Sequence, residues 1–152
     1  MSEEQQRAKD AHLGLRFWVE FDNNIEVAGF MECTGLSVET ETFEYAEGGE
    51  NTYTHKLPVR TTYGNVTLKR GIDPGQDFFR WYEDCINGNM TRKNISIMIY
   101  GPEPNKPAVR RWDLRRAFPV KWTGPDMRAE SGAVAVETLE LAHEGLIPVS
   151  SK

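Results

Sequence analysis

Long apolar stretches, metal-ligand clusters and a secretion signal are all missing from this 152-residue sequence. No stretch approaches the roughly 18 apolar residues of a membrane helix, so stable membrane insertion is not expected. The polar first residues are followed by no apolar segment, which predicts a chain made in the cytoplasm without a cleaved signal peptide. Cys33 and Cys85 lack metal-ligand spacing and are expected to be buried thiols. Neither a metal nor any other cofactor is predicted.

Motifs of known enzymes are also missing. There is no G-x-S-x-G sequence and no reactive-cysteine signature. The glycine pair 48–49 lies between two glutamates that would repel a phosphate, and no Gly-Lys-Ser/Thr follows it. His12, His55 and His143 are scattered, without a ligand partner three or four residues away, so a structural or surface role is favoured. We therefore expect no catalytic activity.

Basic residues are in the minority and are unevenly placed. Eighteen Lys and Arg stand against 23 Asp and Glu, and the net charge of −5 argues against a basic nucleic-acid reader. Residues 37–50 carry five glutamates and no base, whereas residues 106–128 carry seven bases and two acids. Two such windows pair within one chain or between copies, or they form two solvated faces.

Two tryptophans allow more than one interpretation. Trp112 is interleaved with arginines, as base stacking needs, but strand alternation explains the same pattern, so no sequence-specific nucleic-acid binding is expected. Trp18 lies on the polar face of the strand that begins at Leu13. An exposed Trp18 indicates a protein interface, whereas a second buried face would explain it equally well.

Period-two alternation of apolar and polar residues predicts a chain made mainly of β-strands. Strands are expected near 13–21, 25–34, 37–45, 65–70, 95–99, 111–122 and 133–144. From Trp112 to Trp122 the apolar side chains share one parity, which favours one long strand or two strands joined near Pro119. Between Val136 and Leu139 the parity changes, which favours a bulge or a strand that bends from one sheet layer to another.

One helix is predicted, because a run of apolar residues has the spacing of a single helical face. Asp73 can cap it, Pro74 suits its first position, and Gln76 stands where a capping-box partner belongs. Its buried stripe would consist of Phe78, Trp81, Tyr82, Cys85 and Ile86. The helix would end at Asn87-Gly88.

These elements predict a mainly β fold, either an antiparallel β-barrel or two orthogonally packed sheets, with one flanking α-helix. A single domain at 13–147 would follow a flexible arm at 1–12 and precede a short tail at 148–152. Residues 46–64 lack a core pattern, so they form either two exposed strands or an extended functional loop.

Several short motifs follow one another in a fixed order along the chain. They include the segments 44–51, 55–58, 68–71, 81–82, 87–88, 92–94, 119–125 and 137–145. Together they resemble the tail-tube proteins of contractile-tailed phages, and the resemblance runs from about Phe17 to Gly145. The same family supplies inner tubes to R-type bacteriocins and to extracellular contractile injection systems.

The resemblance implies a structural subunit whose six copies form a ring, with rings stacked into a hollow tube. A contractile sheath would drive the tube through a target envelope, and DNA or an effector protein would pass through its lumen. The implied partners are further copies of the chain, the sheath protein and the baseplate or tube-initiator proteins. The particle would be assembled in the bacterial cytoplasm and then released or anchored. The type VI secretion tube protein is similar in fold.

The resemblance also implies that residues 46–64 reach neighbouring subunits. The contact residues that it assigns are Glu47, Gly48, Gly49, Glu50, Asn51, His55, Lys56 and Pro58. Three residues elsewhere join them, since Trp18 would add affinity and the basic Arg110 and Arg111 would set the register against the acidic window.

Two alternatives stay open. A baseplate tube initiator or terminator belongs to the same class and differs in its copy number. A small flavin-binding or other ligand-binding β-barrel is of another class, with the basic window seating a phosphate.

Overall fold

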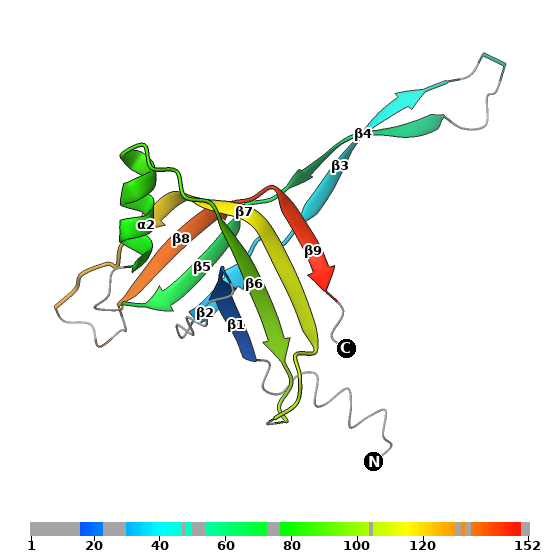
Figure 1. The fold of residues 1–152 in the computed structure, drawn as a ribbon. Helices are drawn as coiled ribbons and strands as arrows, with labels where there is room; N and C mark the ends of the chain where they lie inside the picture. The colour runs from blue at the N-terminus through cyan, green and yellow to red at the C-terminus, as the bar shows by residue number, and fades with distance from the viewer. Residues whose placement is uncertain are drawn as a thin grey trace.

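The structure is a computed structural model that describes residues 16–22, 30–46, 48–49, 54–72, 77–103, 105–129, 132 and 135–149. In these ranges it contains nine strands and one helix (Figure 1). The strands are β1 (Arg16–Phe21), β2 (Phe30–Thr34), β3 (Val38–Tyr45), β4 (His55–Tyr63), β5 (Val66–Gly71), β6 (Lys93–Tyr100), β7 (Arg110–Thr123), β8 (Val136–Ala142) and β9 (Gly145–Val149). The helix is α2 (Asp77–Ile86). The expected mainly β fold with one helix is confirmed.

Strand β7 is long enough to belong to two sheets. Its first half pairs with β6 and β9, and its second half pairs with β8. The first sheet therefore holds β1, β6, β7 and β9, and the second holds β7, β8, β5 and β2, all antiparallel. Arg116 has a φ of 51°, with Leu114 fully buried before it and Ala117 fully buried after it. The single parity predicted from Trp112 to Trp122 is therefore wrong, because the inward face changes at Arg116.

The core lies between these two sheets and follows the alternation of the strands. In the first sheet, Val19, Ile97 and Trp112 are register partners that form one inward row. The second sheet contributes four fully buried side chains: Val66, Leu68, Leu139 and Leu141. The residues between them point outward and are more exposed, as the period of two predicts.

Helix α2 packs over one end of this core (Figure 1). Its Phe78 and Trp81 are buried, with ring centroids 5.7 Å and 5.9 Å from the ring of Phe21. Ile86 is 67% exposed, so the buried stripe is shorter than predicted and ends one residue earlier, at the half-buried Cys85. The predicted capping residues lie outside the described ranges: Asp73, Pro74 and Gln76.

A buried ion pair lies inside the second sheet. Arg70 on β5 and Glu137 on β8 are register partners, 3% and 5% exposed, and Nε of the arginine donates to Oε1 of the glutamate at 2.6 Å. The other carboxylate oxygen accepts a hydrogen bond from Nε1 of Trp122 at 3.2 Å. β5 and β8 pair without a register shift. The parity change between Val136 and Leu139 therefore reflects a buried glutamate on the inward face, and the predicted bulge is wrong.

Candidate subunit interface

Strands β3 and β4 form a separate two-stranded sheet that projects from the body of the domain (Figure 1). We call these paired residues, 38–45 and 55–63, the arm. Every residue of β3 is exposed, and in β4 only the two end residues, His55 and Tyr63, are half-buried. Of the two possibilities open for residues 46–64, the structure therefore shows exposed strand rather than extended loop at 55–63.

Close backbone packing holds the base of the arm. Gly35 has a φ of 93°, and a Cβ there would clash with the carbonyl oxygen of Asn65. Gly64 donates its backbone N–H to the carbonyl oxygen of Ser37 at 3.2 Å. The buried ring of His143 lies with its two nitrogens 3.1 Å from backbone carbonyl oxygens, one of them that of Gly64. These contacts set the direction in which the arm leaves the body, and they give His143 a structural role.

One face of the arm is apolar near its tip. In the register of the two strands, Phe43 lies opposite Leu57 and Tyr45 lies opposite His55. Phe43 is 57% exposed and Leu57 is 49% exposed, while the rings of Tyr45 and His55 stack with centroids 5.3 Å apart. We call these four residues the apolar face. A two-stranded sheet alone is marginal in water, and this one carries two large apolar side chains that are about half exposed, so the arm is a candidate contact surface.

The opposite face of the arm is polar near its tip. Nζ of Lys56 lies 3.6 Å from Oε1 of Glu44, and Thr42 lies opposite Pro58. The register shifts between Glu41 and Thr42, where Val59 is skipped, and this bulge separates the tip from the base. The two faces of the arm therefore differ in chemistry, and only one of them calls for burial against a neighbour.

The structure places the predicted contact residues in different parts of the chain. The arm and its turn hold Gly48, Gly49, His55, Lys56 and Pro58. Three of the predicted residues lie outside the described ranges: Glu47, Glu50 and Asn51. Three lie on strands of the body: Trp18, Arg110 and Arg111. Sequence reasoning missed Phe43 and Leu57, although each stands two residues from an aromatic ring on its own strand, a spacing that marks a shared face.

The predicted contact residues of the body differ in their exposure and in whether their side chains already have a partner. Trp18 is half-buried on the outward face of β1, opposite Met98. Arg111 donates from Nε to Oδ1 of Asp113 at 3.0 Å, so its charge is already engaged. Arg110 is exposed at the start of β7, opposite Ile99. Arg110 is therefore the more available cation for a contact with another copy.

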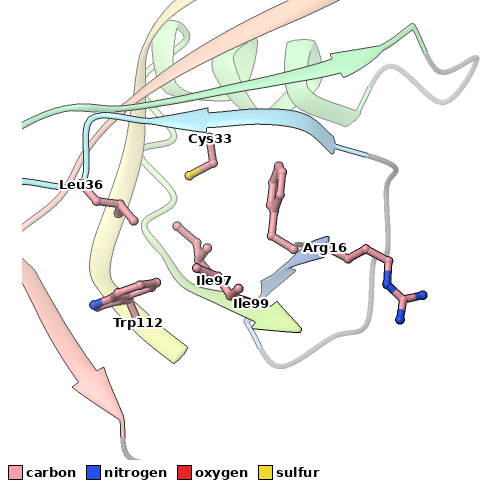
Figure 2. A pocket seen from close by; sticks show the side chains of 7 residues that line it. Arg16, Cys33, Leu36, Ile97, Ile99 and Trp112 are labelled. Atoms are coloured by element: carbon pink, nitrogen blue, oxygen red, sulfur yellow. The ribbon is translucent and has the colours of Figure 1, made fainter. Parts of the chain in front are cut away.

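An apolar cavity of about 200 Å³ opens at the end of the core away from α2 (Figure 2). Its walls are Phe17, Cys33, Leu36, Ile97, Ile99 and Trp112. Arg16 lies at its edge, with the guanidinium turned away from the apolar walls (Figure 2). Small-molecule sites usually measure about 300–1,000 Å³ and carry several placed polar groups. The cavity therefore does not fit a flavin.

Burial in this cavity wall raises the pKa of the Cys33 thiol from about 9 to about 11. Since the folded chain keeps this proton to a higher pH than the unfolded chain, ionisation destabilises the fold as the pH rises from about 9 to about 11. We expect alkylation of Cys33 by iodoacetamide to keep accelerating up to about pH 11 in the folded protein. Mass spectrometry of each cysteine, with the denatured chain as control, measures this. An equal pH dependence of the Cys33 alkylation rate in the folded and the denatured chain would contradict this expectation.

In the part of the chain that the structure describes, no group of three His, Cys, Asp or Glu side chains is placed to hold a metal ion. No helix there is long and apolar enough to cross a membrane. The arm with its uncovered apolar face is therefore the strongest candidate for a functional surface.

Comparison with known families identifies the family of the chain. The sequence pattern of the T4-like virus tail tube protein gp19 matches residues 14–147. The chain belongs to this tail tube family. The resemblance inferred from the short motifs is thereby confirmed. No curated protein sequence matches this tail tube protein at a significant level.

Solved structures of contractile injection systems contain similar chains. A chain in the cryo-EM structure of the anti-feeding prophage baseplate is 28% identical, with a TM-score of 0.76, over 90% of this tail tube protein and 94% of that chain. A chain in the sheath–tube complex of an extracellular contractile injection system, PVC, is 26% identical, with a TM-score of 0.74, over 99% of both chains. Hcp1 from Flavobacterium johnsoniae is 13% identical, with a TM-score of 0.53, over 87% of this chain and 93% of its own, and shares the fold alone.

Proposed function

We propose that this chain is the structural subunit of the inner tube of a contractile injection machine or phage tail. The observation that carries the proposal is the projecting arm, on which the large apolar side chains of Phe43 and Leu57 are about half exposed. A domain that works alone gains nothing from such a face, whereas a subunit that assembles buries it. Membership of the tail tube family supports the same role, as does the end-to-end similarity to a chain of a sheath–tube complex.

Six copies would form a ring, and rings would stack into a hollow tube. β1 and β2 stand at the two ends of the strand order, so their outer backbone edges are available to strands of other copies. The nine residues of β4, at about 3.3 Å each, extend the arm about 30 Å, far enough to reach across a neighbouring subunit. A head-to-tail contact of this kind closes into a ring or continues as a filament.

The contact between copies would join opposite charges. The acidic window lies largely on β3, where Glu39 and Glu41 are exposed, and the basic window includes the exposed Arg110. Such pairs set the register more than they add affinity. The residues that we assign to contacts between copies are Glu47, Gly48, Gly49, Glu50, Asn51, His55, Lys56, Pro58, Trp18, Arg110 and Arg111.

The tube would act as a conduit and not as an enzyme. Its partners would be the sheath protein outside, the baseplate or initiator proteins at its end, and DNA or an effector protein in its lumen. A subunit with a net charge of −5 does not grip the phosphates of passing DNA. Assembly would take place in the bacterial cytoplasm, and the tube would act as part of a released or anchored particle.

One observation favours a second role in the same class. The similar chain of the baseplate structure has a TM-score of 0.76, close to the 0.74 of the chain in the sheath–tube complex. A tube initiator or terminator is therefore the alternative to a repeating subunit. Quantitative mass spectrometry of purified particles separates the two. We expect a copy number comparable to that of the sheath protein, whereas a few copies per particle would assign the chain to the tube end.

A further inference from the structure

The two ends of the barrel core are closed differently. At the end marked by Phe21 on β1, the rings of Phe78 and Trp81 from α2 fill the space between the sheets. At the other end, marked by Phe17, no described side chain closes the space, and the apolar cavity of about 200 Å³ opens there. Among the described residues, aromatic side chains thus close one end of the core, whereas an open apolar cavity, which we call the socket, lies at the other.

The socket has the size and chemistry of a receptor for one side chain. Apolar cavities of about 150 Å³ hold a benzene molecule. A socket of about 200 Å³ with apolar walls therefore accommodates a phenylalanine ring, and it is too small for most metabolites. Its walls supply no set of polar groups that would orient a small ligand.

The chain also carries an uncovered aromatic side chain of this kind. Phe43 lies on the apolar face of the arm, 57% exposed, with Leu57 directly opposite it. The arm projects away from the body (Figure 1), so its tip does not reach the socket of its own domain. A second copy of the chain is therefore the molecule that can accept it.

Charges around the two features are complementary. Glu39 and Glu41 are on the same strand as Phe43 and, by strand alternation, on the same face. Arg16 stands at the edge of the socket, and the exposed Arg110 is the register partner of the socket residue Ile99. Glu41 has Arg60 as its register partner, whereas Glu39 lies opposite Thr62. Glu39 is therefore the carboxylate that an arm entering this socket brings toward the arginines, which favours this pairing over others.

We propose that Phe43 of one copy inserts into the socket lined by Phe17, Ile99 and Trp112 of a second copy. The inference rests on the proposed tube function and names the acceptor that this function leaves open. Each subunit then inserts its own Phe43 into one neighbour and accepts the Phe43 of another, through two different surfaces. This is the head-to-tail arrangement that can close into a ring or continue from ring to ring.

Photo-crosslinking from the arm tests the proposal. The variant Phe43→p-azidophenylalanine keeps an aromatic ring at the tip and forms a covalent bond with its surroundings on illumination. In assembled tubes we expect a crosslinked dimer, and mass spectrometry should place the bond on the socket walls. The matched control is Thr42→p-azidophenylalanine, on the polar face of the same strand, where crosslinks to the socket should be lost.

Two results would overturn the inference, and they are distinguishable. Tubes that form normally but crosslink from position 43 to another surface, or to residues 1–15 of the same chain, refute the socket and leave the tube function standing. Failure of the unmodified protein to form tubes at all refutes the function and the socket together. As a second variant, Leu36→Trp fills the socket from its wall, and we expect a folded monomer that no longer assembles. Normal tubes from that variant would refute the socket.

Discussion

Replacing Phe43 and Leu57 together with serine is expected to abolish tube assembly and to leave a folded monomer. Both side chains are about half exposed in the single chain, so the core of the domain loses no packing. Burial of such a side chain contributes about 1.5–3 kcal/mol, and this contribution would be lost at every subunit contact. Electron microscopy measures the loss of tubes, and circular dichroism with thermal melting measures the integrity of the domain.

A control on the other face of the arm separates the apolar face from the arm as a whole. Val38 is 52% exposed and belongs, like Thr42, to the face opposite Phe43. The double variant Val38→Ser with Thr42→Ser changes two exposed residues of the arm on that opposite face and should assemble normally. Normal tubes from the variant lacking Phe43 and Leu57 would show that the apolar face is not the contact.

Glu137→Ala is expected to lower the free energy of unfolding by about 3–5 kcal/mol. The reason is that Arg70, only 3% exposed, would keep its charge in the interior without a carboxylate. Its Nη2 atom already has no hydrogen-bond partner, and the guanidinium carbon lies 3.7 Å from the centroid of the Phe78 ring. Trp122 would also lose its acceptor. Urea unfolding followed by tryptophan fluorescence measures the change.

Removing both charges should lower the free energy of unfolding far less than removing one. The double variant Arg70→Met with Glu137→Leu replaces the ion pair with apolar side chains of similar size, and such exchanges are often neutral or stabilising. We therefore expect its free energy of unfolding to lie close to that of the unmodified protein. A loss below about 1 kcal/mol for Glu137→Ala alone, the range of exposed ion pairs, would show that the pair is solvated in solution.

Strands buried on one face could be predicted from the sequence because burial imposes a period of two. The inward residues of β1, Val19 and Phe21, and those of β5, Val66 and Leu68, follow this period and are buried as expected. The helix was predictable for the same reason at its own period, and its buried Phe78 and Trp81 lie on the expected face. Local alternation was sufficient where a strand keeps one apolar inward parity along its length.

The prediction failed where a polar residue faces inward or the backbone changes its direction. Glu137 is charged and therefore looks like a surface position, yet Arg70 on the neighbouring strand makes its burial possible. Nothing near either residue in the sequence indicates the other. At Arg116, a single residue with positive φ reverses the inward parity of β7, and the residue type gives no sign of it.

The arm was the hardest part to predict, because the surface that we propose as its cover belongs to another copy of the chain. Phe43 and Leu57 are of the residue types that fill a core, yet both are about half exposed in the single domain. The sequence therefore indicated that this segment reaches outward and did not indicate which of its faces would make contact. The pairing of β3 with β4 supplied that information, since register decides which side chains share a face.

Negative-stain electron microscopy of the purified protein tests the central claim most directly. The sample would be concentrated and supplied with preformed tube ends as templates. The account predicts hollow tubes of uniform diameter, built from stacked six-fold rings, that lengthen with protein concentration. Fields without rings or tubes at every concentration, with and without templates, would contradict it.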